Sequence, residues 1–562
     1  MMKTRKKSTF KPIAWLDKNL LFILSAFLLI FIPLYPKWPL FDLVPGYIVR
    51  LRLEDLLIAA VFIIVIIQVL RKKVKLLPNP LLLPIGIYLI IGFLSLLSGV
   101  FITQTIPLQT IHLGKAVLHY LRRVEYFSLF FIFYASVRTM KQVKTLVYLL
   151  GITAIAVSLY GFGQKYFGWP VYSTMNREFS KGWRLVLTQY ARVPSTFAGH
   201  YDLAAFLAFF MAIFGGLFLY LKKSFLKTFF IIVFILSFFI LILTASRTSF
   251  IAYLIGISAV IALLAFRAKR PVLWGLSRWI TITSLSLLVM FFYGDLSERF
   301  ANFFKFDMMS DYVFGTLIRE KLFGYEEEDL KFVQLNDDLS LVYSRSDIPP
   351  KVVDKGGQKL PSDVYKNIPD YVGTDSAKAT KSGALVEVDG EFKLASESGE
   401  ATPGAVIEVP RNYSDTAFVV GLSSAIRFDA LWPMAIKGFL KNPVLGSGYS
   451  TLNKKKVSDF TEAESTDNDY LRSLGETGLL GFLAFFAIIA ILFKTIFTSL
   501  PKIKDRFSYA LAVGFIGGTI AILVNALYID VFEASKIAFM FWGMAGILLV
   551  VLKLQVKNEN KK

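Results

Sequence analysis

Long apolar runs separated by short polar connections constrain the fold of this 562-residue chain more than any other feature. A helix needs about 20 apolar residues to cross the core of a bilayer. Apolar residues make up 55% of the chain, more than a soluble protein can bury. We therefore predict an all-α integral membrane protein with about 12 transmembrane helices, and we exclude a soluble enzyme, a disordered protein and a nucleic-acid binder. The predicted spans are Leu20–Tyr35, Asp55–Leu70, Leu81–Ile102, Ala116–Val137, Thr145–Gly161, Asp202–Leu221, Thr228–Thr244, Ser249–Phe266, Trp279–Tyr293, Gly478–Phe497, Tyr509–Tyr528 and Ile537–Leu554.

The distribution of charge predicts how these spans are oriented. Residues 295–478 carry 30 acidic and 21 basic side chains, whereas the rest of the chain carries 11 and 41. Short loops rich in Lys and Arg stay in the cytoplasm, and long loops cross the membrane largely regardless of charge. We therefore expect both termini in the cytoplasm and the long loop outside it. The basic connections are Met1–Lys18, Arg71–Lys75, Arg138–Lys144, Lys222–Lys227, Arg267–Arg278, Lys502–Arg506 and Lys553–Lys562.

Three regions follow from this topology. Residues 1–294 form an N-terminal membrane region of about nine spans, 295–477 form one large extracytoplasmic loop, and 478–562 form a C-terminal membrane region of about three spans.

The large loop divides into two parts. Alternating segments on either side of Asp389-Gly390 indicate a hairpin, so we predict a small β-rich insertion at about 331–420. This insertion is either structural or recruits a partner. The remainder, 423–477, is predicted to contain amphipathic helices, because its apolar residues recur at helical spacing. Asn442-Pro443 should end one of these helices, and another should start near Asp467.

Arginines near the ends of spans suggest chemistry at one membrane surface. Arg247 lies in a very short turn between two apolar runs, where an arginine either snorkels to the interface or binds an anion. A guanidinium matches phosphate oxygens bidentately. Arg427 and Arg192 lie on the same predicted face. Arg123, next to Arg122, lies there against the positive-inside rule, so either the span boundary slips or these arginines are functional.

Asp467 and Asp469 are candidate general bases, because a carboxylate can take the proton from an attacking hydroxyl group. The alternative is that the Asp467–Asp469 segment caps a helix, and the two roles are compatible. The chain has no Cys and three His, which excludes thiol chemistry and disfavours a metal site. We therefore expect neither a metal nor another cofactor.

The sequence resembles a known family in four stretches. These are similar to motifs of the O-antigen ligase and O-antigen polymerase superfamily of bacterial envelope glycosyltransferases. One, in which His200 and Asp202 stand near a usual Asn, runs from Ser195 to Ala204. The others are Leu243-Thr244-Ala245-Ser246-Arg247-Thr248; Arg427 to Trp432 with Pro443 and Gly446-Ser447-Gly448; and Asp467-Asn468-Asp469-Tyr470-Leu471 with Glu476-Thr477-Gly478-Leu479-Leu480-Gly481.

The resemblance implies a function. Members of this superfamily move a glycan from a polyprenyl diphosphate carrier to an acceptor hydroxyl at the outer face of the bacterial inner membrane. By resemblance, Arg247 and Arg427 would bind the diphosphate. Ligases of the family have His where this chain has Asp467, and some polymerases have Asp there. The acceptor, which is a glycan, a lipid or a protein, stays open.

We thus expect catalytic roles for Asp467, Asp469 and Arg427. Diphosphate binding is assigned to Arg247, Arg427, Arg192 and Arg123, and other substrate contacts to His200, Asp202 and Asn468. The expected partners are the polyprenyl-diphosphate-linked glycan, its acceptor and membrane lipids, with no nucleic acid. The main alternative is a polytopic transporter or flippase for a lipid-linked or polyanionic substrate, and a structural or sensory scaffold is a third.

Overall fold

The computed structural model describes, apart from short gaps, residues 12–294, short strands between 333 and 394, and residues 427–452 and 466–559. The described part is mostly helical, and ten of its helices are long and apolar enough to cross a membrane. Each predicted span overlaps a helix, but the helices at Leu20–Tyr35 and Ala116–Val137 are not among these ten. The N-terminal helices are α1 (Pro12–Leu34), α2 (Leu53–Leu70), α3 (Leu82–Phe101), α4 (Thr110–Ser136), α5 (Met140–Phe167), α6 (His200–Tyr220), α7 (Phe225–Leu243), α8 (Arg247–Ala265) and α9 (Pro271–Phe292). The later helices are α16 (Trp432–Lys441), α17 (Asp469–Ser499), α18 (Arg506–Asn525) and α19 (Ser535–Glu559).

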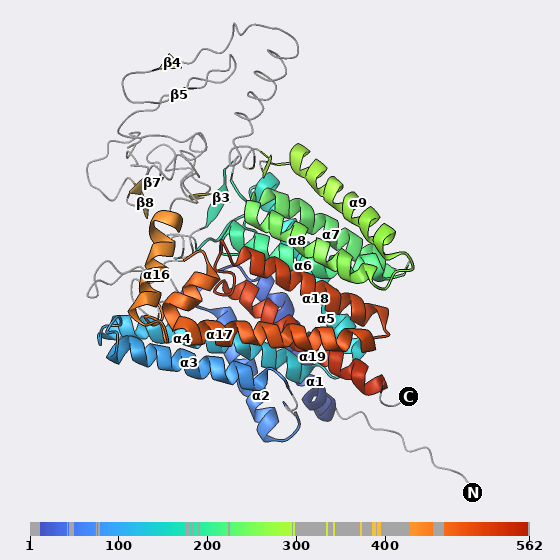
Figure 1. Cartoon of the computed structure of the whole chain (residues 1–562), viewed down its shortest axis with the longest axis horizontal. Helices are drawn as coiled ribbons and strands as arrows, with labels where there is room; N and C mark the ends of the chain where they lie inside the picture. Colours follow the sequence, from blue (N-terminus) through green and yellow to red (C-terminus); the bar gives the residue numbers. More distant parts are fainter. Residues whose placement is uncertain are drawn as a thin grey trace.

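The long helices run side by side in a bundle (Figure 1). Helices α6, α18 and α19 are buried over most of their length, with α18 packed on α6 and α8, and α19 packed on α4. Helix α9 lies at the edge of the bundle, contacts α8 and is mostly exposed. Side chains on such an outer helix face lipid in a membrane, which explains their apolar character.

Glycines allow α18 to lie at the centre of the bundle. A Cβ atom on Gly514 would be 2.7 Å from the Ile213 Cα of α6, and one on Gly518 would be 2.7 Å from the Phe209 carbonyl oxygen. Gly256 of α8 meets α18 in the same way at Gly517, whose carbonyl oxygen would be 2.8 Å from an added Cβ. Small residues let membrane helices approach until their backbones touch. These contacts fix the packing of α6, α8 and α18.

Several connections meet at one end of the bundle, which we call the loop face. The buried Lys536, near the start of α19, donates hydrogen bonds to the carbonyl oxygens of Pro33 (3.0 Å), Tyr35 (2.7 Å) and Thr196 (2.7 Å). This ammonium group therefore ties the end of α1 and the connection before α6 to α19. At the opposite end, Arg267 donates to the carbonyl oxygens of Leu500 and Ile503.

The described strands form two-stranded antiparallel pairs. The strands are β1 (Pro39–Phe41), β2 (Leu51–Arg52), β3 (Leu185–Leu187), β4 (Val333–Gln334), β5 (Leu341–Val342), β6 (Tyr371–Gly373), β7 (Leu385–Val388) and β8 (Glu391–Leu394). Pairing of β7 with β8, in which Val388 faces Glu391, confirms the hairpin predicted around Asp389-Gly390. Most of the predicted insertion at 331–420, including 405–409 and 416–420, lies outside the described residues.

Helix α17 is kinked near the loop face, and the segment after α16 docks into this kink. Gly478 has φ 64° and ψ −169°, a conformation open essentially only to glycine. The backbone NH groups of Ser447 and Gly448 donate to the carbonyl oxygens of Gly475 (2.9 Å) and Glu476 (3.0 Å). The two glycine-containing motifs thus contact each other. The predicted boundary at Gly478 coincides with this kink, where two helical segments meet.

Candidate functional site

The turn between α7 and α8 places Arg247 at the loop face. Ser246 caps α8 by accepting a hydrogen bond from the Ser249 NH group, after Ala245 adopts a left-handed conformation with φ 51°. The Ser249 hydroxyl group donates to Asn525 Oδ1 at 2.7 Å, which anchors the turn to α18. Arg247 is the first residue of α8 and is half-buried. Its guanidinium group therefore lies at the positive end of a helix dipole, where anions are favoured.

Arg192 lies next to this turn. The Val193 NH group donates to the carbonyl oxygen of Leu243, the last residue of α7, at 3.2 Å. The Arg192 guanidinium lies 5.9 Å from the centre of the Tyr201 ring. Tyr201 and Arg192 are both close enough to Arg247 to act on it electrostatically. Two of the arginines singled out in the sequence therefore lie together.

Arg427 brings a third guanidinium group to the same place. It begins a π-helical turn, Arg427–Leu431, that leads into α16, and its side chain is buried. Arg427 donates to the Tyr528 carbonyl oxygen at 3.2 Å and pairs with Asp467 Oδ2 at 2.7 Å. Arg427 and Tyr528 are also electrostatic neighbours of Arg247. We call Arg192, Arg247 and Arg427, together with Tyr201, Tyr528 and Asp467, the arginine cluster.

Asp467 is held in place by the backbone on both sides of it. The Asp530 carboxylate accepts hydrogen bonds from the NH groups of Thr466 and Asn468, each at 2.8 Å. Arg472 pairs with the same carboxylate at 2.7 Å. Asp467 itself has φ 52°, which is uncommon for a residue other than glycine. This clamp presents the Asp467 carboxylate to Arg427.

The helix-capping alternative applies to the neighbouring residue. Asn468 caps α17, because its Oδ1 accepts a hydrogen bond from the Leu471 NH group at 2.9 Å. Its side-chain amide also donates to the Leu527 carbonyl oxygen. Asp467 lies before the helix, and 29% of its side chain is exposed. The capping role and the candidate base thus fall on different residues.

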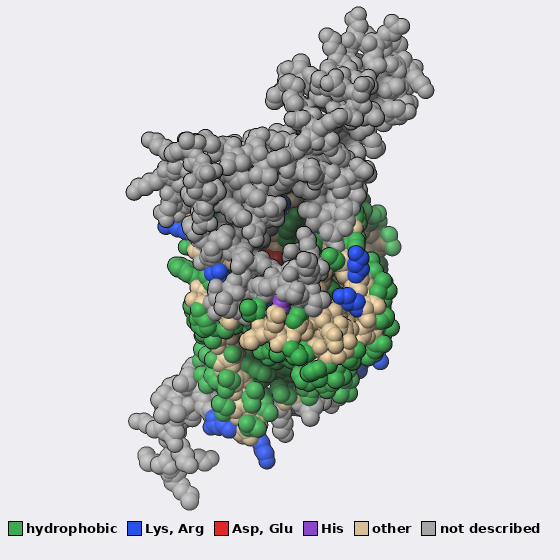
Figure 2. Space-filling model, turned by 90° about the vertical axis from the view of Figure 1, so that its left-hand side faces the viewer, with side chains coloured by type: hydrophobic (Ala, Val, Ile, Leu, Met, Phe, Trp, Pro, Cys, Tyr) green, Lys and Arg blue, Asp and Glu red, His purple; other side chains and the backbone are tan. Residues whose placement is uncertain are grey.

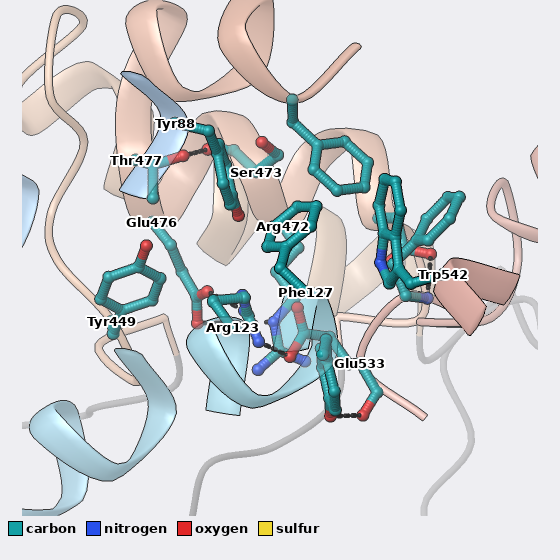
Figure 3. A pocket seen from close by; sticks show the side chains of 14 residues that line it. Tyr88, Arg123, Phe127, Tyr449, Arg472, Ser473, Glu476, Thr477, Glu533 and Trp542 are labelled. Atoms are coloured by element: carbon teal, nitrogen blue, oxygen red, sulfur yellow. Dashed lines mark hydrogen bonds and ion pairs between the residues drawn. The ribbon is translucent and has the colours of Figure 1, made fainter. Parts of the chain in front are cut away.

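Asp469 has a different environment from that of Asp467. It is buried, and its Oδ2 accepts a hydrogen bond from the Phe532 NH group at 3.1 Å. Asp469, Arg472 and Glu476 line a small cavity below the loop face, shown in Figure 3. The cavity volume of about 30 Å³ holds one or two water molecules and is far too small for a sugar diphosphate. Asp469 therefore belongs to an internal polar network.

Arg123 is part of this internal network too. It forms ion pairs with Glu533 and, at 3.4 Å, with Glu476 (Figure 3). Arg122 pairs with Asp55 at 2.9 Å and with Glu125 at 3.2 Å. These carboxylates neutralise the two arginines that break the positive-inside pattern. The structure therefore pairs Arg123 with carboxylates and does not group it with the arginine cluster.

His200 and Asp202 begin α6 beside the cluster. His200 is buried, and its ring centre lies 3.9 Å from that of Tyr201. Asp202 lies within electrostatic range of Asp467, and also of Lys37 and Lys536.

A buried ion pair lies close to Asp202. Lys37 pairs with Glu54 at 2.7 Å. Burial lowers the pKa of the Lys37 ammonium, although the Glu54 carboxylate opposes this shift. Figure 2 looks onto the loop face and shows that the described side chains visible around the bundle are mostly hydrophobic.

Sequence reasoning did not assign a role to three participants. Tyr201 and Tyr528 stand between the arginines, and Asp530 holds the Asp467 segment. Asp530 could have been singled out from the sequence, because it is a carboxylate just after the apolar run that ends at Tyr528. Among the described residues, no group of three or more His, Asp or Glu is arranged to hold a metal ion.

Comparisons with known proteins give no family. No protein-family model matches the sequence, and no curated protein matches it either. Function must therefore be argued from the geometry of the arginine cluster and from the motif residues.

Proposed function

We propose that this chain is a membrane glycosyltransferase of the O-antigen ligase or polymerase type. It would move a glycan from a polyprenyl diphosphate carrier to an acceptor hydroxyl group, with no metal ion required. The observation that carries the proposal is the meeting of Arg192, Arg247 and Arg427 with the carboxylate of Asp467 at one end of an apolar helical bundle. This arrangement suits a lipid-linked donor, because the apolar helices would contact the polyprenyl tail, the arginines would contact the diphosphate, and the glycan would lie outside the bundle.

The charge of the cluster favours a polyanionic group. Arg192, Arg247 and Arg427 bring three guanidinium groups together there, and Arg247 begins α8, whose N-terminus is the positive end of its dipole. Guanidinium groups bind phosphate oxygens in pairs of hydrogen bonds. Placed where negative charge develops, they stabilise the departing diphosphate in the transition state.

The reaction we propose is a single displacement at the anomeric carbon of the donor sugar. The acceptor oxygen forms a bond to that carbon, and the bond from the carbon to the diphosphate oxygen breaks. The electron pair of the broken bond leaves with the diphosphate towards Arg247 and Arg192. The acceptor hydroxyl proton passes to the Asp467 carboxylate. Asp467 suits this role better than the buried Asp469, because its side chain is partly exposed and lies within the cluster.

The proposed membrane arrangement has twelve spans in the bacterial inner membrane. Both termini lie in the cytoplasm, and the loop face points outward. The basic connections of the sequence support this orientation. A lipid-linked glycan would then meet the arginine cluster at the outer surface.

Transfer by purified protein tests the proposal. The protein would be placed in nanodiscs with a polyprenyl-diphosphate oligosaccharide and candidate acceptors, with metal ions chelated. We expect glycan release by the wild type and loss of it in Arg247→Ala, Arg427→Ala and Asp467→Asn. Arg192→Ala should weaken release, whereas Arg184→Ala, in the same connection but outside the cluster, should leave release unchanged.

The same variants distinguish transfer from transport. If wild type and variants all bind the carrier equally and none transfers glycan, the transferase proposal fails and a flippase becomes the better account. A flipping assay in proteoliposomes would then test that account. If none of the added acceptors is the natural one, we still expect hydrolysis or exchange of the donor, and Arg247→Ala should abolish it.

A further inference from the structure

Helix α16 and the turn after it carry an apolar stripe that the described part of the chain leaves exposed. Ile436 and Leu440 lie one turn apart on α16, with exposed fractions of 47% and 66%, and Val444, 55% exposed, follows in the turn after the helix ends at Lys441. Lys437 and Lys441 are exposed beside them. We propose that α16 binds the surface of the lipid bilayer, with the stripe among the acyl chains and the two ammonium groups at the lipid phosphates. This inference does not depend on the proposed transferase activity.

The orientation of the stripe is fixed by close packing of α16 on α17. Ala435 and Gly438 are buried on the opposite side of α16. A Cβ atom on Gly475 of α17 would lie 2.8 Å from the Ala435 carbonyl oxygen. A Cβ atom on Gly438 would lie 2.6 Å from Leu452 Cδ2. Contacts this close leave α16 little freedom to rotate and bury the stripe against the protein.

The stripe continues directly into the outer surface of α17. The Leu480 NH group donates to the Val444 carbonyl oxygen at 3.2 Å, and the Leu479 NH group donates to the Pro443 carbonyl oxygen at 2.8 Å. Leu479, Leu480 and Leu483 are about half exposed at the start of the apolar part of α17. A span of this kind faces lipid with such residues. This continuity identifies the bilayer as the occupant of the α16 stripe.

The direction of α16 agrees with an interfacial position. Figure 1 shows α16 lying across the end of the bundle, whereas the apolar part of α17 runs along it. A helix in the plane of the interface buries one apolar face and keeps its charged side chains at the head groups. Long lysine side chains reach the phosphate layer from such a helix. Because the turn Arg427–Leu431 leads directly into α16, this anchor also sets the depth of the arginine cluster.

The absence of cysteine from the chain allows a clean test. Single cysteines replacing Leu440, Lys437 or Leu483 would be labelled with an environment-sensitive fluorophore in the full-length protein. The protein would be reconstituted in nanodiscs of equimolar phosphatidylcholine and phosphatidylglycerol. Quenching by lipids brominated on their acyl chains is then compared with quenching by iodide. Leu483→Cys is the lipid-facing reference, and Lys437→Cys is the matched control on the same helix.

We expect the fluorophore at Leu440 to behave like the one at Leu483, with several-fold stronger quenching by brominated lipid than by iodide. The fluorophore at Lys437 should show the reverse order. Iodide quenching at Leu440 equal to that at Lys437 would overturn the proposal, since α16 would then stand in water. Protection of Leu440 from both quenchers would overturn it too, because protein would cover the stripe. Ile436→Cys replaces Leu440→Cys if the latter does not fold.

Discussion

At the scale of single residues, Asp467 has a backbone conformation that its surroundings must maintain. Its left-handed backbone (φ 52°) is one that residues other than glycine adopt only when the surroundings hold them there. Asp530 provides this constraint through the NH groups of Thr466 and Asn468. Asp530 is itself fixed by Arg472. We infer that Asp530 is a positioning residue that acts through Asp467.

Replacing Asp530 by Asn tests that inference. The amide retains one oxygen acceptor, so one of the two NH groups beside Asp467 loses its partner, and Arg472 loses this counter-charge but keeps its ion pair with Glu476. We expect glycan transfer to fall by about 100-fold, because a displacement near 1 Å of a catalytic group has that effect. Carrier affinity should stay close to that of the wild type, since Arg192 and Arg247 are untouched.

The comparison of kcat with KM separates positioning from a purely structural role. A fall in kcat with unchanged KM and a shifted pH profile supports positioning. Equal loss of folded protein and activity contradicts it. Arg184→Ala is the control for a charge change on the loop face outside the cluster.

Replacement by Asn should greatly reduce transfer when it is made at Asp467 but not when it is made at its neighbour Asp469. Asp467→Asn should reduce transfer by roughly 100- to 10,000-fold without unfolding the protein, because a general base is lost. Asp469→Asn should retain transfer. Its amide oxygen can still accept a hydrogen bond from the Phe532 NH group.

Transfer rates and unfolding temperatures of the two variants, measured side by side, check this prediction. A third variant, Asp469→Ala, leaves the Phe532 NH group without its acceptor. It should lower the unfolding free energy by about 1–3 kcal/mol. Loss of transfer in a folded Asp469→Asn protein would instead identify Asp469 as the base.

At the scale of elements, the kink of α17 is where this helix contacts the segment that follows α16. The segment after α16 lies against the kink, where a Cβ atom on Gly446 would be 2.5 Å from the Glu476 carbonyl carbon. Gly478 has the conformation that produces the kink. Two glycines from different motifs therefore depend on each other.

Gly478→Ala should be severely destabilising. The added methyl group would collide with the Val444 carbonyl oxygen, and the backbone conformation is unfavourable for alanine. We expect the unfolding free energy to fall by at least about 2 kcal/mol, measured by thermal unfolding in detergent. Gly86→Ala in α3 is the matched control, since nothing lies within 4 Å of its added Cβ. That change should be neutral or slightly stabilising. Equal effects of the two substitutions would contradict this account of the kink.

Local patterns in the sequence predicted most of the elements but few of the contacts between them. The apolar runs gave the helices, the Asp389-Gly390 pair gave the β7–β8 hairpin, and α16 ends at Lys441 just before Asn442. The ion pair of Arg123 with Glu533 joins residues 410 positions apart. No local pattern encodes such a contact. For the same reason, the sequence suggested that the arginines lie together, but it could not show that Arg123 pairs with distant carboxylates instead of joining the arginine cluster.

At the scale of the whole molecule, charge is sorted between the two ends of the bundle. Basic connections lie at the end where Arg267 binds the link between α17 and α18. The loop face instead holds acidic side chains paired with Lys37, Arg122, Arg123 and Arg472. Paired charges add little net charge to their end of the bundle. The end that carries the basic connections is therefore the one expected to stay in the cytoplasm.

Single cysteines again allow this orientation to be measured in cells. Lys72, Lys269 and Lys504 are exposed at the basic end, and Trp38 and Arg184 are exposed at the loop face. A membrane-impermeant maleimide added to intact spheroplasts should label cysteines at Trp38 and Arg184. It should label those at Lys72, Lys269 and Lys504 only after the membrane is opened. The opposite pattern would place the arginine cluster on the cytoplasmic side and exclude transfer at the outer surface. Labelling of both ends from outside would mean that the bundle does not span the membrane as proposed.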